Sequence, residues 1–597
     1  MRVELLGAIN YDKLASYMDK RVDQLVSDNN SILESVTKLK DKNLCTPENI
    51  GLLDDIISYL SNNANGDITE SYIKDLKRIK ESFYKNREDI DAAIKLFRKN
   101  IKSNNEDLYR LRKETIETIK QLEKERRTAL VAAAGNLSHF SGKVFEMLEE
   151  IESRALDKNT KLVDNICKLG HNSIEDHDYV VFLVEDVSVM LEQILIEERF
   201  SSFTIKSRRE VNFANEGAYI PDFHDEFGNV IPKNESVRKE FKEFVDWLFG
   251  RYSFFIDNGI AKEDARFVLP YNFNSNFFMG MDAHTLKDVI IRLTKTKLSL
   301  IQEVKELGER LYEIAKEHIP YIIPEIDRTP VNLNDDVKDY IVKHIGNQNY
   351  KILDKPKLIS SSTDVDDTIL ITAIMRKTQL SYEQSKMMYE ESIRKNPNFK
   401  EELMELIFKN GDRNELAQVG FEFQIPISYA VLTHYTRHRT HPITVPPFAS
   451  GIDLYQYKIP PAIKEDEGVE GGLCDKFNDI YTLNKLLYDK FKTDYGIREE
   501  DLVYFTLSGH MVNIITRLDG KTFAHIDALR ECERAQWESR DIARGLHDEV
   551  REIKGAELFS SNLGPLCETH GICKEGKRSC GKVIELRKQK EQEKESI

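Results

Sequence analysis

The spacing of apolar and polar positions changes along the chain, and these changes predict its main elements. Residues 1–9 (MRVELLGAI) alternate enough to predict a strand. From about residue 12 to 127 the apolar residues recur every three or four positions in a highly charged sequence, which predicts amphipathic helices. We expect Asn104 and Asn105 to break this segment into an antiparallel helical hairpin. Such a segment is typical of a packing or dimerisation arm, and a clamp for a nucleic acid or a partner protein is the alternative.

Further along, one plan occurs twice: an apolar strand followed by a helix. The matching pairs of segments are 179–199 with 421–439, and 266–293 with 503–530. Superposing Arg199 on Arg439 gives an offset of 240 residues, and superposing Asp282 on Asp519 gives 237. Nearly equal offsets predict a duplicated domain of about 200–240 residues, and a chance similarity of amphipathic segments is the alternative.

The two copies join near residues 328–350, where a proline and several asparagines precede an apparent new opening strand at 350–359. The predicted fold is therefore α+β, with two tandem domains that each hold a mixed sheet with flanking helices. We divide the chain into an opening strand (1–11), a helical insertion (12–127), the rest of the first copy (128–328), the second copy (350–556) and a Cys/His-rich tail (557–597).

Composition limits the functions that fit this plan. A chain of 597 residues is too long for one ordinary core. The net charge of -16 disfavours general nucleic-acid binding, but a few local arginines can still hold one small anion. We expect no membrane span, because no run of about 18 apolar residues occurs, and the N-terminus lacks the apolar core of a signal peptide. Four of the seven cysteines (Cys45, Cys167, Cys474 and Cys532) are scattered, which suits a reducing cytoplasm.

Two basic segments carry the candidate chemistry. One is residues 432–448 (LTHYTRHRTHPITVPPF), and its counterpart in the first copy is 197–209 (EERFSSFTIKSRR). Arginine offers a bidentate fork to phosphate, and serine hydroxyls add neutral donors. Taken alone, Ser207-Arg208-Arg209 is typical of a solvated surface loop.

Arg437-His438-Arg439 after a helix, together with residues 529–538 (LRECERAQWE), resembles the flavin-dependent thymidylate synthases. The signature of that family is Arg-His-Arg, two residues, Ser, one residue, Asn-Glu, one residue, Ser, one residue, Arg. The resemblance covers about 128–325 weakly and 350–555 more strongly, and leaves the insertion and the tail uncovered.

Each copy departs from the family signature in a different half. The second copy keeps Arg-His-Arg and then has Pro442, Thr444-Val445 and Pro447 where Ser, Asn-Glu and Ser are expected. The first copy has Glu197 and Glu198 in place of Arg-His, but keeps Arg199, Ser202, Ser207 and Arg209. Two further family arginines divide in the same way. The first copy keeps the one that opens a strand as Arg266, where the second copy has Val503. The second copy keeps the one on a later helix as Arg530, where the first copy has Leu293.

In the family each active site is built across a subunit interface, so this division implies one composite site between the two copies. The resemblance assigns the phosphate to Ser202, Ser207, Arg209 and Arg266, the base to His434 and Arg437, and the flavin to Arg437, His438, Arg439, Asp519, Lys521, His525 and Ser173. It assigns catalysis to Arg530, which would polarise the uracil ring. His434 stands where the family usually has a glutamine that contacts the base.

The resemblance implies an FAD-dependent methyltransferase that methylates C5 of dUMP, with NADPH and methylenetetrahydrofolate as co-substrates. His434 and the missing Asn-Glu motivate one alternative, a relative that modifies another pyrimidine nucleotide. A nucleotide- or flavin-binding scaffold without activity is the other alternative. Because the family forms homotetramers, two duplicated chains would reproduce four domains, and we expect a homodimer. Cys532 follows Arg530 closely, and we interpret it as a core residue.

The tail contains Cys567, His570, Cys573 and Cys580, spaced Cys-x2-His-x2-Cys-x6-Cys. Zinc is bound tetrahedrally by thiolate and imidazole ligands, so this spacing predicts a structural zinc site. A site of three cysteines with another metal and a set of unligated thiols are the alternatives.

Overall fold

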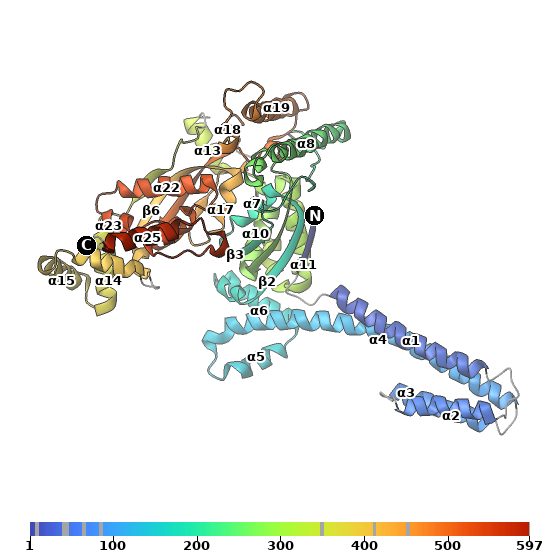
Figure 1. Cartoon of the computed structure of the whole chain (residues 1–597). Coiled ribbons are helices and arrows are strands. Elements are labelled where there is room, and N and C mark those ends of the chain that lie inside the picture. The colour runs from blue at the N-terminus through green and yellow to red at the C-terminus, as the bar shows by residue number, and fades with distance from the viewer. Residues whose placement is uncertain are drawn as a thin grey trace. The chain divides into compact units, whose positions relative to one another are not determined.

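The computed structural model describes residues 1–5, 11–38, 47–62, 67–82, 87–346, 351–409, 413–448 and 454–595, so Cys45 lies outside the described residues. Figure 1 traces the chain, which divides into two units. The larger unit holds residues 1–5, 179–313 and 325–597, and the smaller one holds 6–178 and 314–324.

The larger unit contains two antiparallel sheets of four strands with the same topology. The first has the order β1 (Arg2–Leu5), β2 (Tyr179–Ser188), β4 (Asn274–Asp282), β3 (Ser201–Ile205). The second has the order β5 (Lys357–Ser361), β6 (Gly420–Ser428), β8 (Met511–Asp519), β7 (Ile443–Thr444). The predicted α+β class and tandem duplication are confirmed, although the strand pairings of both sheets are antiparallel rather than mixed.

Register and helix caps repeat along with the strand order. The strand β2 pairs with β4 from Tyr179 opposite Asp282, and β6 pairs with β8 from Gly420 opposite Asp519. Asp282 accepts a hydrogen bond from the Thr285 amide at 2.7 Å, and Asp519 accepts one from Thr522 at 2.8 Å. Each aspartate therefore caps the helix after its strand by satisfying an amide at the helix N-terminus. The two residues that anchored the repeat in the sequence occupy equivalent places in the fold.

The helices of the first repeat are α7 (Val189–Ile196), α8 (Asn234–Asp257), α9 (Lys262–Ala265), α10 (Ala283–Lys295), α11 (Gln302–His318) and α12 (Ile323–Arg328), and α13 (Asp336–Ile345) follows it. The helices of the second repeat are α14 (Val365–Thr378), α15 (Tyr382–Lys395), α16 (Phe399–Lys409), α17 (Tyr429–Thr436), α18 (Pro461–Lys464), α19 (Leu473–Thr493), α20 (Glu499–Leu502), α21 (Gly520–Arg530) and α22 (Trp537–Arg551). The tail adds α23 (Glu557–Ser561), α24 (Leu566–Thr569) and α25 (Lys582–Glu595).

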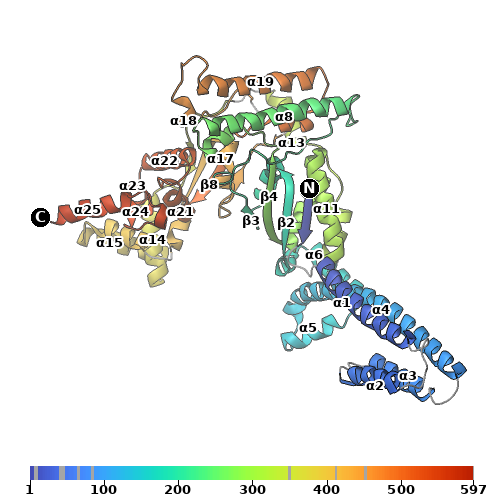
Figure 2. The ribbon, with the colours of Figure 1, turned by 45° about the vertical axis from the view of Figure 1, so that its right-hand side comes forward.

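The two repeats share backbone hydrogen bonds and an apolar core. The Tyr271 amide donates to the Thr506 carbonyl at 2.7 Å, and the Ser508 amide donates to the Leu269 carbonyl at 2.9 Å. Figure 2 shows α8 and α19, one from each repeat, lying side by side. The rings of Phe241 on α8 and Phe491 on α19 lie 6.1 Å apart in that contact. Burial of such aromatic side chains stabilises the contact between the repeats.

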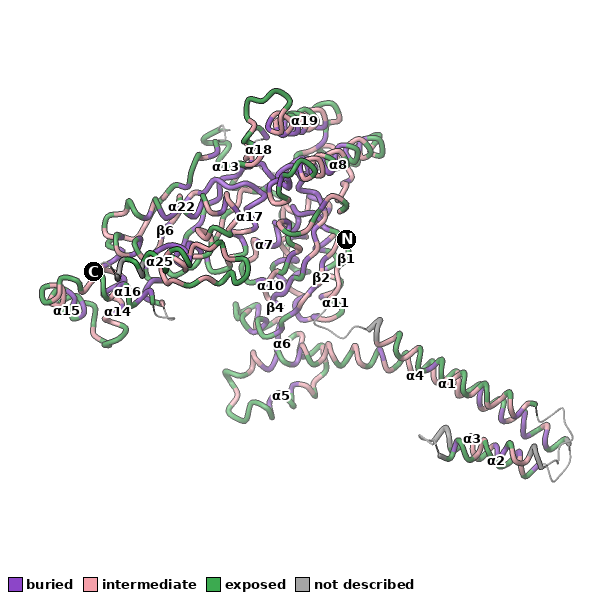
Figure 3. The backbone as a smooth tube through the Cα atoms, viewed as in Figure 1, coloured by how far each residue is buried: buried purple, intermediate pink, exposed green. Residues whose placement is uncertain are grey.

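The smaller unit is helical, with α1 (Tyr11–Lys38), α2 (Pro47–Asn62), α3 (Asp67–Ser82), α4 (Arg87–Asn136), α5 (Val144–Glu152) and α6 (Leu156–Lys168). The prediction of a break at Asn104 and Asn105 is wrong, because α4 runs through both residues. Asn105 instead accepts a hydrogen bond from Asn29 on α1 at 2.7 Å, so its polar side chain is satisfied between helices. In Figure 3 exposed positions outnumber buried ones along α1 and α4, as expected of a helix pair that is largely solvated. Among the described residues, no helix is both long and apolar enough to cross a membrane.

A buried glutamate supports the strand-to-helix corner in each repeat. The Glu538 carboxylate accepts hydrogen bonds from the amide and the hydroxyl of Ser428, at 2.7 and 2.6 Å, where β6 meets α17. Glu303 accepts a bond from the Ser188 amide at the equivalent corner, at 2.6 Å. Burial raises the pKa of Glu303 to about 7, and it also raises the pKa of Glu538. Both carboxyl groups therefore depend on these donors for their buried positions.

We predict that Glu538→Ala lowers the free energy of unfolding by about 3 kcal/mol, because it leaves two buried donors without an acceptor. Denaturant unfolding followed by circular dichroism measures the change. Glu552→Ala, at the exposed end of the same helix, is the matched control and should leave stability unchanged. A loss of under about 0.5 kcal/mol for Glu538→Ala, the usual range of a surface substitution, would contradict this role of the corner.

Candidate active site

Arginines from both repeats surround one histidine. His434 lies on α17, and its Nδ1 is buried without a hydrogen-bond partner among the described residues. Burial lowers the pKa of His434 well below its ordinary value, and the charges of Arg266, Arg530, Arg209 and Arg437 lower it further. The imidazole is therefore neutral at physiological pH and stands within the field of four guanidinium groups.

Arg530 ends α21 and is held by groups of α17 and the residues after it. Its Nη2 donates to the His434 carbonyl at 2.7 Å. Its Nε and Nη2 approach Nε2 of His438 at 3.2 and 2.9 Å. Burial and then the charge of Arg530 lower the pKa of His438 to about 3, so His438 is neutral and its Nε2 accepts from the guanidinium. Both acceptors are neutral, which leaves the positive charge of Arg530 uncompensated by them.

Arg209 and Arg266 approach this cluster from the first repeat. Arg209 donates from Nε to Glu263 Oε2 at 2.6 Å, and from Nη2 to the Arg534 carbonyl of the second repeat at 3.4 Å. Arg266 is 3% exposed, and its Nη2 has no partner among the residues that the structure describes. Burial, followed by the charge of Arg208, lowers the pKa of Arg266 to about 10. An unpaired donor on a buried cation is costly, and an anion would satisfy it.

A cavity of about 700 Å³ lies where the repeats and the tail meet. It is lined by Arg209 and Glu210 of the first repeat, Leu529, Arg530, Cys532, Arg534 and Ala535 of the second, and Glu575, Lys577 and Arg578 of the tail. Five cations face two carboxylates in this lining, so the cavity suits an anionic ligand. The two basic segments of the sequence gave no indication that the tail lines this cavity.

Neither Ser202 nor Ser207 lines this cavity. The Ser202 hydroxyl accepts from Arg439 Nη1 at 2.9 Å, and the same nitrogen donates to the Ser201 carbonyl at 2.9 Å. Ser207 accepts from the Arg209 amide at 3.4 Å, so it supports the loop that carries Arg209. Ser202 therefore joins the repeats through Arg439, and Ser207 acts on Arg209.

The residues predicted for the flavin separate into two groups. His438 lies between His441 and His525, with ring centroids 6.5 and 6.2 Å away. Sequence reasoning missed His441, which is buried, and Nε2 of this residue has no partner among the described residues. Its only signal was the short spacing Arg-His-Arg-Thr-His. Burial lowers the pKa of His441 to about 4.

Three other predicted flavin residues are engaged elsewhere. Asp519 caps α21, which gives a structural reason for an acidic side chain there. Lys521 donates to the Asn414 side chain at 2.7 Å. Ser173 is exposed and lies in a short 3-10 helix (Asn172–His177) of the smaller unit.

The equivalent corner on the other side of the repeats is different in charge. A cavity of about 440 Å³ there is lined by Ile194, Glu197, Arg292, Thr296, Lys297, Leu298, Ile301, Asn332, Asn334, Asp335, Val445, Pro446, Pro447, Phe448 and Glu500. Two cations face three carboxylates in it. Arg292 Nη2 donates to the Ile194 carbonyl at 2.9 Å, which matches the bond of Arg530 to His434. Counted from the equivalent caps Asp282 and Asp519, Leu293 is the position that corresponds to Arg530, and it is a core residue, so the similar bond is made by the neighbouring Arg292.

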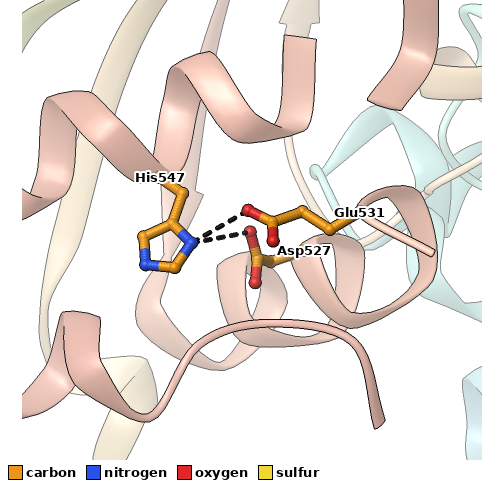
Figure 4. Close-up of side chains that lie close together, drawn as sticks. All are labelled: Asp527, Glu531 and His547. Carbon is orange, nitrogen blue, oxygen red and sulfur yellow. Dashed lines mark hydrogen bonds and ion pairs between the residues drawn. The ribbon is translucent and has the colours of Figure 1, made fainter. Parts of the chain in front are cut away.

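Near the end of the helix that carries Arg530, three titratable side chains form a cluster that the sequence did not reveal (Figure 4). Nδ1 of His547 lies 2.8 Å from Glu531 Oε1 and 3.9 Å from Asp527 Oδ1. Its Nε2 lies 3.0 Å from the Ser560 carbonyl, and Asp527 Oδ2 accepts from the Gly564 amide at 2.6 Å. Both ring nitrogens of His547 thus face acceptors, and the cluster joins α21 to α22 and the tail.

The described cysteines form no disulfide, and they include a group in the tail. Cys567, Cys573 and Cys580 line a small cavity together with Cys532, whereas His570 does not line it. Cys532, which we interpreted as a core residue, is only half-buried and faces these thiols.

Comparisons with known proteins agree with the duplicated fold. The family model described as thymidylate synthase complementing protein matches residues 120–321 and 357–554, which together are more than half of the chain. A flavin-dependent thymidylate synthase of Geobacter sulfurreducens is 29% identical over 162 residues, which are 26% of this chain and 65% of the relative. One of Sulfolobus acidocaldarius is 30% identical over 221 residues, 36% of this chain and 79% of the relative. One of Clostridium tetani is 25% identical over 248 residues, 39% of this chain and 96% of the relative.

We predict that His547→Gln destabilises the protein more at pH 6 than at pH 8.5. Burial lowers the pKa of His547, but the hydrogen bond to Glu531 and the charge of Asp527 outweigh it, so the net pKa is raised. A raised pKa in the folded state gives stability that is present below the unfolded value of about 6.5 and is lost as pH rises through the folded value. Thermal unfolding of both proteins at the two pH values measures this difference. An equal shift in Tm at both would show that the charge of His547 contributes nothing.

Proposed function

Because the chain belongs to the thymidylate synthase complementing protein family, we propose that it is a flavin-dependent thymidylate synthase-like methyltransferase. In this proposal it methylates C5 of dUMP with methylenetetrahydrofolate and NADPH, at one composite site between its repeats. The observation that carries the proposal is the 700 Å³ cavity in which Arg209 of the first repeat and Arg530 of the second line the same wall. Neither repeat contributes both arginines.

A nucleotide monophosphate fits the charge of this cavity. The converging guanidinium groups repel one another, and a phosphate between them would replace repulsion with charge-assisted hydrogen bonds. The Nη2 of Arg266 is a buried donor without a partner among the described residues, although Arg266 itself does not line the cavity. We assign the phosphate to Arg209 and Arg266, with Ser207 supporting the Arg209 loop and Ser202 positioning Arg439 across the repeats.

Arg530 is the residue that we assign to catalysis. Its Nη2 and Nε are fixed by the His434 carbonyl and His438 Nε2, so the guanidinium is oriented before any substrate arrives. Such a fixed cation beside the uracil N3/O2 edge would stabilise the charge that makes C5 nucleophilic. Because His438 is neutral, it orients the guanidinium without lowering its positive field.

The flavin side of the proposal rests on the chemistry of the donors present. When bound, the flavin would supply the redox chemistry that moves reducing equivalents from NADPH to the transferred methylene. We assign its binding to Arg437, His438, Arg439 and His525, and add His441, whose buried Nε2 is available for a hydrogen bond. Asp519 acts on the flavin only through the helix that it caps, Lys521 is bonded to Asn414, and the assignment of Ser173 stays a prediction.

One observation favours a second candidate substrate. The neutral His434 stands in the middle of the arginine cluster, where the family resemblance places a glutamine. An imidazole offers one ring donor and one acceptor on a rigid ring, whereas an amide offers both from one flexible group. A pyrimidine nucleotide with a different base edge is therefore the alternative substrate, and a scaffold without activity is the remaining alternative. We also retain the homodimer and a cytoplasmic location as proposals.

We predict that Arg530→Ala lowers kcat by about 100- to 1,000-fold, because it removes a fixed cation from the reacting base. Tritium release from C5-labelled dUMP, with methylenetetrahydrofolate and NADPH, measures turnover. Arg292→Ala, which removes the matching arginine of the other corner, is the control and should keep full turnover with unchanged circular dichroism. Equal activity of Arg530→Ala and the wild type would remove Arg530 from the mechanism.

We predict that Arg209→Ala weakens dUMP binding by about 10- to 100-fold, since it removes a charge-assisted contact. Isothermal titration of the flavin-loaded protein gives the Kd, and flavin absorbance shows that the cofactor is retained. A double variant with Arg530→Ala should bind still more weakly, since the two arginines face one ligand. Unchanged affinity in Arg209→Ala would contradict a site built from both repeats.

A further inference from the structure

Four thiols from separate parts of the sequence surround one small cavity. Cys532, Cys567, Cys573 and Cys580 line a space of about 20 Å³, together with Glu533, Arg534, Pro565, Glu575, Ser579, Lys582 and Val583. The thiol of Cys567 interacts electrostatically with those of Cys532 and Cys580. Cys532 follows the end of α21, whereas the other three cysteines lie in the tail. The cavity therefore lies where the tail contacts the end of α21, the helix that carries Arg530.

His570, which the sequence spacing placed among the metal ligands, has its partners elsewhere. Its Nδ1 lies 2.7 Å from the Thr569 hydroxyl, and its Nε2 lies 3.4 Å from the Phe408 carbonyl and 3.4 Å from Arg413 Nη2. The spacing predicted four ligands within the tail, but the fold replaces the histidine with Cys532. Linear spacing could not show this, because Cys532 is 35 residues before Cys567.

The backbone around the cavity is shaped to bring the thiols together. Gly571 and Gly581 have φ values of 65° and 91°, which a side chain would disfavour, and they turn the chain on either side of Cys573 and Cys580. The Ser579 hydroxyl lies 3.4 Å from Cys573 Sγ and accepts a hydrogen bond from the Gly581 amide at 3.2 Å. Hydrogen bonds of this kind orient the ligands of metal sites.

We propose that Cys532, Cys567, Cys573 and Cys580 bind one thiophilic metal centre that fixes the tail to the end of α21. Four thiolates are a ligand set of structural zinc and of iron–sulfur clusters. The small volume fits a single zinc ion, since about 10–15 Å³ already accommodates a body the size of a water molecule. Arg534 and Lys582 in the lining offset part of the negative charge of four thiolates.

Binding draws the sulfurs inward. In the structure no three of the four sulfurs lie within 4.8 Å of one another. Among the described residues, only Asp527, Glu531 and His547 bring three possible metal-ligand atoms that close. Zinc–sulfur bonds are about 2.3 Å long, so the cysteine side chains must rotate toward a common centre when the metal binds. Rotation about χ1 is inexpensive for side chains that are only half-buried or exposed, as these are.

The consequence for the neighbouring cavity follows from shared residues. Cys532, Arg534 and Glu575 line both the thiol cavity and the 700 Å³ cavity, and Lys577 and Arg578 lie between Cys573 and Cys580. The metal therefore holds two cations of the tail on the wall of the larger cavity. Only this consequence rests on the proposed function, whereas metal binding itself does not.

Metal analysis of the full-length protein, purified without oxygen, tests the proposal. We expect about one zinc per chain, because the cavity fits a single ion, and iron with acid-labile sulfide would contradict that assignment. Cys532→Ser should reduce the metal content at least fivefold. His570→Gln and Cys474→Ser, which alters a buried thiol elsewhere, should retain it. Wild-type protein that stays metal-free after incubation with zinc, or a loss in His570→Gln but not in Cys532→Ser, would overturn the proposal.

Two further measurements keep the test valid if Cys532→Ser does not fold. In the wild type, the bound metal should protect four thiols from alkylation until a chelator removes it, and protection of fewer would exclude four ligands. Trypsin should cleave after Lys574, Lys577 or Arg578 faster once a chelator has removed the metal, and an unchanged rate would exclude a role in fixing the tail.

His547→Gln should retain the metal, and its loss there would assign the ion to the Asp527–Glu531–His547 cluster instead. Metal retention with failed dUMP binding would reject only the proposed function.

Discussion

The candidate site must hold together guanidinium groups from both repeats that repel one another, and this repulsion is the physical constraint on its structure. Arg209 and Arg266 come from one repeat and Arg437 and Arg530 from the other, and all four act on the neutral imidazole of His434. Like charges in a partly buried setting repel strongly, because water screens them poorly there. Glu263 is the carboxylate that bonds to Arg209, while the acceptors of Arg530 are a carbonyl and a neutral imidazole. The cluster thus keeps a net positive charge, which is what an anion requires of it.

Buried neighbours hold most of these groups in place, and an ion pair with Glu263 adds to the hold on Arg209. Backbone hydrogen bonds such as Tyr271 to Thr506 join the repeats, and Glu538 fixes the corner from which α17 leads to Arg437. Asp519 caps α21, whose last residue is Arg530. Orientation is therefore set by buried contacts that form on folding, before any ligand binds. Such preorganisation is the main way in which a protein site stabilises developing charge.

Local patterns predicted the parts of the structure that local forces determine. The repeated strand and helix, and the equivalence of Asp282 and Asp519, follow from apolar periodicity and capping, which operate over a few residues. The break at Asn104 and Asn105 was wrong because a partner helix satisfies Asn105. The contacts of His438 with Arg530, and of Cys532 with the tail thiols, also depend on distant segments. No spacing within one segment carries that information, and the Asp527–Glu531–His547 cluster left no sequence signal for the same reason.

Duplication within one chain allows two equivalent corners to differ. In separate identical subunits each change would appear at both corners, whereas here Glu197 stands where Arg437 stands in the other repeat. Arg292 still donates to the Ile194 carbonyl as Arg530 does to that of His434, so the arginine itself survives in the second corner. What differs is the surrounding charge: burial raises the pKa of Glu197 to about 7, and Asp335 and Glu500 line the same cavity. A phosphate would meet carboxylates at that corner and would also lack two cations, because Glu197 and Val503 stand where the other corner has Arg437 and Arg266.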